Sequence, residues 1–452
     1  STTAGALYVG WHTGVNGTMT IGGTAKLNVQ TLSTGNVGGT ANVYFGGDSE
    51  NYIGGAVLLG SRENSQASSM TISESAITNV QGFFYVANAA NASASLNIAG
   101  GTTNVTGGFG IGTGSGSNAT FVMSEGTLNL YNIAQIGLRT NSQVVSTLSG
   151  GTINAMGSNY AIANGDGIVT TMSLEGTHVK ATTVNIANAA VSSTSSSTFG
   201  GTAYVTLSGG TLAASANLFM ANQASTAATL TINGGTLTVG NNMQIGNGGT
   251  ATNATLLLSA GHVYVQNTLT IAKGGYAGIS GTGILAAGTL SIDNGGIFRG
   301  RLFVGALSGA PANYARVNNL VLAIGVQLQD DTYLSSTGRV SLVVSGSSDS
   351  GADALIQMAN IIAENGAQIS VDLTNFVITG EETVDILSYV DATNLNGVTI
   401  TVTGYNQSNW IVEGQWNETT KMLELMILIP EPAANAALLG LLALAVAVRR
   451  KK

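Results

Sequence analysis

Carboxylate side chains carry most acid and base chemistry on polysaccharides, and they are sparse in the first 300 residues of this chain. Cleavage of a glycosidic bond needs two or three of them close together, commonly beside an arginine or lysine. Only eight occur there, so this region is not expected to hold a catalytic centre. They are Asp48, Glu50, Glu63, Glu74, Glu125, Asp166, Glu175 and Asp293.

The one concentration of polar groups lies around the stretch GGDSENYIGG, where Glu50 is followed by Arg62 and Glu63. These three residues are the best candidates for a polysaccharide lyase or hydrolase site. A solvated loop is the simpler interpretation.

Two further carboxylates, Glu125 and Glu175, are expected at the same turn position two repeats apart, with Gly150 in phase between them. A separation of about 10 Å would leave them independent. The acidic pairs at 330–331 and 381–382 have the ligand type that cations prefer, but exposed acidic turns are the favoured interpretation.

No metal or cofactor site is expected. His12, His178 and His262 each lack a partner at the spacing of a metal pair, and the chain has no cysteine. The run GFGIGTGSG (108–116) superficially matches a dinucleotide loop, but it lies inside a repeat and no helix follows it.

Composition indicates a folded, weakly charged protein. Of 452 residues only 8% are charged while 44% are hydrophobic, and there are 63 Gly and 3 Pro. This balance favours short strands joined by turns and a buried core. The net charge is −8, and no basic stripe runs through the body, so nucleic acid is not an expected partner.

The strongest pattern is a repeat of about 25 residues with the frame x-Φ-x-Φ-x-G-G-T-Φ-x-Φ, in which Φ is apolar. Each unit holds three short alternating runs, as in Leu230/Ile232, Leu237/Val239 and Met243/Ile245. Three strands per unit predict an all-β fold, a right-handed parallel β-solenoid with one unit per rung. The Thr after the turn marks the phase, at Thr102, Thr127, Thr152, Thr177, Thr211 and Thr236, with His262 next.

Turn residues recur at fixed places in the repeat. Paired glycines at 100/101, 150/151, 209/210 and 234/235 are expected to supply positive φ at a sharp corner. An Asn recurs after the third strand, where it is expected to adopt the left-handed conformation and to bond between rungs. These residues are Asn88, Asn164, Asn188, Asn222 and Asn247.

We expect three regions along the chain. Residues 1–300 form the solenoid, in which 6–14 already match a third strand, so that a capping end is expected to be missing, and 188–201 form a projecting loop. Residues 301–429 form a C-terminal β-rich cap or sandwich. Residues 430–452 form a tail, with a transmembrane helix at 433–448 that is short for a membrane span.

The tail resembles the PEP-CTERM sorting signal of Gram-negative bacteria. Pro430, Glu431 and Pro432 match the tripeptide, the apolar helix follows, and a basic stop completes it with Arg449, Arg450, Lys451 and Lys452. The resemblance implies that an exosortase-type enzyme removes the tail and that the protein passes from the inner membrane to the cell surface or extracellular matrix. Ala433 replaces the Ser or Thr often found after the motif. The GGTL turns also resemble autotransporter-associated repeats.

Three functions follow as hypotheses. The first is an exported, non-enzymatic structural or adhesive protein, with an extracellular glycan as a partner of its Thr, Ser and Asn surface. The second is a polysaccharide-active enzyme on the same scaffold. The third is an autotransporter-like passenger, which requires a membrane barrel on this or a separate chain.

Overall fold

The computed structural model describes residues 4–10, 12–35, 39–187, 200–223, 225–247, 253–306, 313–347, 351–352 and 355–428. The chain forms a β-solenoid of about 13 turns, in which 66% of residues are in strands, and no α-helix occurs among the described residues. The expected all-β solenoid is therefore confirmed. The right-handed sense of the coil stays a prediction, and the predicted helix at 433–448 lies outside the described residues.

The chain divides into two compact units. Unit 1 comprises Ser1–Phe303 and Leu307–Val317, and unit 2 comprises Val304–Ala306 and Asn318–Lys452. Strands β26 (Leu302–Val304) and β27 (Ala315–Ala323) each carry residues of both units.

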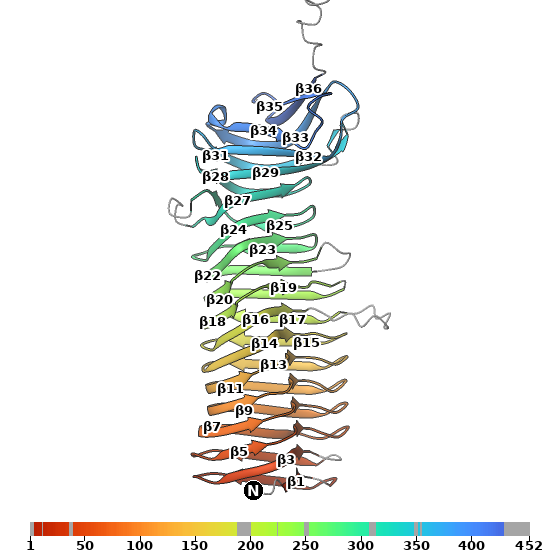
Figure 1. The fold of residues 1–452 in the computed structure, drawn as a ribbon, viewed down its shortest axis with the longest axis vertical. Coiled ribbons are helices and arrows are strands. Elements are labelled where there is room, and N and C mark those ends of the chain that lie inside the picture. The colour runs from red at the N-terminus through yellow and green to blue at the C-terminus, as the bar shows by residue number, and fades with distance from the viewer. Residues whose placement is uncertain are drawn as a thin grey trace, which may run out of the picture. The chain divides into compact units, whose positions relative to one another are not determined.

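Unit 1 is built from three stacks of parallel strands, so that each rung contributes one strand to each stack (Figure 1). The first stack consists of β2 (Asn16–Ile21), β4 (Thr40–Phe45), β7 (Ser68–Val80), β9 (Ser93–Val105), β11 (Asn118–Leu130), β13 (Gln143–Leu148), β15 (Val169–Leu174), β17 (Thr202–Leu207), β20 (Ala227–Val239), β22 (Asn253–Ile271), β23 (Gly275–Ile279) and β25 (Ile297–Arg299).

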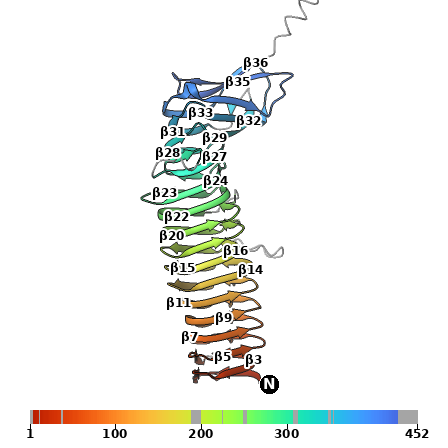
Figure 2. The same ribbon diagram turned by 60° about the vertical axis from the view of Figure 1, so that its left-hand side comes forward.

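The other two stacks reuse the longer strands, which continue from one stack into the next; Figure 2 shows the same layering of β7, β9 and β11 from a second direction. The second stack adds β3 (Lys26–Thr34), β5 (Glu50–Ile53), β14 (Thr152–Ile162), β16 (His178–Ile186), β18 (Thr211–Ala214) and β24 (Ile284–Ile292). The third adds β1 (Ala4–Val9), β6 (Val57–Leu59), β8 (Phe84–Val86), β10 (Phe109–Ile111), β12 (Ala134–Ile136), β19 (Leu218–Met220) and β21 (Met243–Ile245).

The core of unit 1 is the inward half of every alternating strand. The predicted inward residues of one rung, from Leu230 to Ile245, are all buried in the structure. Each stacks on its counterpart in the neighbouring rung, as Leu230 does on Val205 and Leu256. Because the ladders pair the main chain between rungs, the apolar interior needs no polar partner for its backbone.

The repeat phase holds for Thr102, Thr127 and Thr152 but not for Thr177. The partner of Thr152 is His178, which in turn pairs with Thr211. The interval is one residue longer than predicted there, since Leu148 pairs with Leu174 and β14 has an irregularity between Ala155 and Asn159. The inward apolar positions set the register, because a slip by one residue would turn each of them to the solvent.

The paired glycines do form the sharp corners. The second glycine of each pair has positive φ, with a value of 79° at Gly151. A Cβ at Gly151 would also lie 2.7 Å from the carbonyl oxygen of Gly126 in the preceding rung. Close stacking of the corners and the left-handed backbone therefore both require glycine.

Unit 2 keeps parallel ladders but ends in an antiparallel hairpin. Strands β29, β32 and β34 form one ladder and β28, β31 and β33 another, while β36 pairs antiparallel with β33 and β35. The elements are β28 (Gln327–Leu334), β29 (Arg339–Ser347), β30 (Gly351–Ala352), β31 (Ile356–Ala363), β32 (Gln368–Val377), β33 (Glu382–Thr393), the 3₁₀-helix η2 (Leu395–Gly397), β34 (Thr399–Thr403), β35 (Ile411–Asn417) and β36 (Met422–Leu428).

Candidate functional site

The candidate catalytic carboxylate Glu50 is engaged in an ion pair between rungs. It begins β5 and accepts a hydrogen bond of 2.6 Å from the Lys26 ammonium one rung earlier, and both side chains are more than half exposed. Arg62 and Glu63 lie in an exposed turn after β6. An exposed pair of this kind is typical of a solvated surface.

Glu125 and Glu175 do not occupy equivalent positions, so that prediction is wrong. Met123 pairs with Leu148 and Leu148 with Leu174, which places Glu175 one residue earlier in the turn than Glu125. The cause is the same longer interval that displaces Thr177. Glu175 accepts a hydrogen bond from the Ser173 hydroxyl at 3.1 Å.

The histidines lie on the outer surface of unit 1. His178 contacts the Thr211 hydroxyl through Nδ1 at 3.0 Å, and His262 stacks on Tyr264 with ring centroids 5.7 Å apart. His12 lies in an exposed turn. Within the described part of the chain, no three His, Asp or Glu residues are grouped as a metal site would need.

The glycine-rich run 108–116 contains the third-stack strand β10. A Cβ at Gly110 would lie 3.1 Å from the ring of Tyr85 in the preceding rung, and one at Gly108 would lie 3.3 Å from the ring of Phe83. Phe83 and Tyr85 stack on each other at 5.2 Å. These two glycines thus make room for surface aromatic rings.

The recurrent Asn after the third strand does not adopt the left-handed conformation, contrary to prediction. The residue before it does, at Ala87, Ala163, Ala187 and Ala221. Of the expected bonds between rungs, Asn247 donates to the Asn222 carbonyl, while Asn188 lies outside the described residues. The small side chain of Ala limits the steric cost of positive φ at a tight corner.

A ladder of asparagines does exist, at a place that sequence reasoning missed. Asn104, Asn129 and Asn154 each donate from Nδ2 to the Oδ1 of the Asn one rung earlier, at 2.9, 2.8 and 2.9 Å, starting from Asn79. All four are half-buried on the outer side of the second stack. Their regular spacing, always before an apolar residue, was the available signal.

In unit 2 the acidic pairs lie on or beside strands. Asp330 and Asp331 belong to β28, not to a turn, and Asp331 accepts a hydrogen bond of 2.8 Å from Asn360 of β31. Glu382 begins β33, with Glu381 just before it. The alternation of Val326 and Leu328 places this acidic stretch in a strand, because both are buried.

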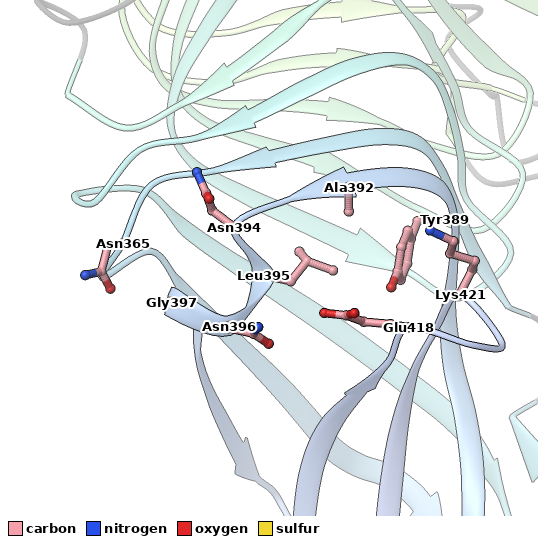
Figure 3. A pocket seen from close by; sticks show the side chains of 9 residues that line it. All are labelled: Asn365, Tyr389, Ala392, Asn394, Leu395, Asn396, Gly397, Glu418 and Lys421. Atoms are coloured by element: carbon pink, nitrogen blue, oxygen red, sulfur yellow. The ribbon is translucent and has the colours of Figure 1, made fainter.

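Unit 2 contains a cavity of about 770 Å³ between the η2 turn and the β35–β36 turn, and this pocket is the best candidate site in the structure. Figure 3 shows Leu395 and Glu418 pointing into the same space from opposite sides, with the Tyr389 ring beside them. The pocket is lined by Asn365, Tyr389, Ala392, Asn394, Leu395, Asn396, Gly397, Glu418 and Lys421.

The walls of this pocket are held by short-range hydrogen bonds. Asn394 adopts the left-handed conformation and accepts from the Gly397 N–H at 3.2 Å, while Gly397 accepts from the Gly366 N–H at 2.8 Å. Opposite, the Asn417 side chain accepts from the N–H groups of Thr419 and Thr420, both at 3.1 Å. Asn and Gly at these turns provide the conformations that close them.

The electrostatics of the pocket centre on Tyr389. Its side chain is buried and packs edge-on against Trp416 at 5.6 Å, and the Lys421 ammonium lies 5.6 Å from its ring centroid. Burial, together with the charges of Glu418 and Asp391, raises the pKa of Tyr389. The phenol therefore stays protonated as a hydrogen-bond donor near neutral pH.

The predicted sorting residues Pro430, Glu431 and Pro432 and the basic stop, Arg449 to Lys452, lie outside the described residues. Among the residues that are described, no helix has the length and apolar character needed to cross a membrane. No protein family matches this chain, and neither a curated protein nor a solved structure is significantly similar to it.

Proposed function

We propose that this chain is an exported, non-enzymatic structural or adhesive protein of the cell surface or extracellular matrix. The observation that carries the proposal is the order of motifs at 430–452, in which Pro430, Glu431 and Pro432 precede an apolar run and four cations. An exosortase-type enzyme is the proposed processing partner, and the inner membrane holds the sorting intermediate.

The body of the chain is consistent with this role. A right-handed solenoid with an outer surface of Thr, Ser, Asn and Gly presents few charges, and the candidate carboxylate Glu50 is paired with Lys26. Stability comes from stacked rungs, not from disulfides, which a chain without cysteine cannot form.

The test is the C-terminus of the protein recovered from its native host, determined by mass spectrometry together with cell fractionation. We expect surface or matrix material to lack 433–452, and a Glu431→Ala variant to keep the tail and stay with the inner membrane. Cytosolic protein with an intact tail would contradict the proposal. Cleavage of a polysaccharide by the purified protein would contradict the non-enzymatic role.

A further inference from the structure

We infer that the pocket of unit 2 binds an uncharged oligosaccharide. The inference deepens the adhesive role and rests on that proposed function for the source of the ligand, because surface and matrix proteins meet saccharides. Binding itself depends only on the pocket.

The polar lining matches saccharide hydroxyls, which both donate and accept hydrogen bonds. Glu418 offers acceptors, Lys421 offers donors, and the Asn396 amide offers both. All three side chains are exposed, so a ligand reaches them without a conformational change.

The charges of the lining balance, with one carboxylate at Glu418 and one ammonium at Lys421. An acidic sugar would gain from Lys421 but would face the carboxylate of Glu418. An uncharged saccharide can bond to both side chains without either repulsion.

The floor of the pocket supplies apolar contact. Leu395 and Tyr389 are each only 5% exposed, and Ala392 lies beside them. Sugar rings carry C–H faces that pack against such surfaces, and a volume of about 770 Å³ lies in the range of small-molecule sites.

The same lining points to binding without cleavage. Hydrolysis of a glycosidic bond uses a pair of carboxylates that flank it. Glu418 is the one carboxylate among the described residues that line this pocket.

The experiment is titration calorimetry of the purified full-length chain with maltotriose, cellotriose and chitotriose, with trigalacturonate as the charged comparison. We expect at least one neutral trisaccharide to bind with a Kd near about 1 mM. Glu418→Gln and Lys421→Asn should each weaken that binding about tenfold, since each removes a charged hydrogen-bond partner. Asn tolerates the left-handed backbone of residue 421, at φ 59°.

Glu413→Gln is the matched control, an exposed carboxylate on the same hairpin that is not part of the lining, and it should bind as the unchanged protein does. The inference is overturned if no neutral trisaccharide binds, if trigalacturonate binds more tightly, or if both pocket variants bind normally. Unchanged melting temperatures show that the variants fold. These results are independent of tail processing, so failure here and failure of the export proposal are distinguishable.

Discussion

Unit 1 and unit 2 both stack parallel strands, but they differ in how many residues a rung contains. Bonded partners of neighbouring rungs are 25 residues apart at Asn104 and Asn129 in unit 1, and 29 apart at Ser341 and Ser370 in unit 2. A short, constant rung places like residues on like residues, and its corners admit little besides glycine. Longer rungs carry extra residues outside the ladders, and these form the walls of the pocket.

The distribution of charge follows the same difference. The first 300 residues hold eight of the 22 carboxylates, although they make up about two thirds of the chain. In a regular stack, equal charges at one repeat position would lie about 4.8 Å apart and repel. Regularity thus favours neutral Thr, Ser and Asn, and the less regular unit can hold Glu418 beside Lys421.

The largest effect is expected from the core of unit 1. Phe109 is buried between Phe84 and Phe121, with ring centroids 5.8 and 5.9 Å away. Phe109→Ala should lower the free energy of unfolding by about 3–5 kcal/mol, measured by urea titration. Phe83→Ala, at a side chain that is 52% exposed, is the control and should change it by no more than about 0.5 kcal/mol. Equal losses would show that the aromatic stack is not the core.

The next effect concerns the corners that distinguish the short rungs. Gly151→Ala places a Cβ against the Gly126 carbonyl and strains a positive φ, so it should cost about 1–3 kcal/mol. Gly22→Ala is the control, because a Cβ at that turn would meet no atom within 4 Å. Comparable thermal stability of both variants would mean that the corners tolerate side chains.

The asparagine ladder tests whether neighbouring rungs reinforce one another through side chains. Asn104→Ala removes two ladder bonds and should cost about 1–3 kcal/mol, while Asn154→Ala removes one and should cost about half as much. Urea titration of both variants and of the unchanged chain measures the ratio. Equal costs would contradict a ladder of independent bonds.

The smallest effect is a pH dependence in unit 2. Hydrogen bonds from the Tyr333 hydroxyl and the Ser336 N–H hold the pKa of Glu364 below its ordinary value of 4.5. A depressed folded-state pKa contributes stability above the unfolded pKa, and this contribution is lost as pH falls through the folded value. Melting temperatures below pH 4.5 should therefore fall less for Glu364→Gln than for the unchanged chain. Glu413→Gln should keep the original slope.

Much of the fold was predictable because the repeat is written in local chemistry. Alternating apolar residues such as Leu237 and Val239 specify strands, and the second glycine of each pair specifies a corner. What failed was phase: Thr177 and Glu175 were misplaced by one residue. A single added residue is invisible to a search for regular spacing, but the core detects it through every inward side chain.

The sequence by itself determined the rung, its inward residues and the order of motifs in the tail, since these depend on residue types at short separations. Only the tertiary structure decided the partners at long separation. It paired Lys26 with Glu50, aligned the four asparagines into a ladder, and brought the η2 turn opposite Glu418. The physical reason is that a ladder register is set jointly by all the inward side chains of two rungs, and no local pattern contains that sum.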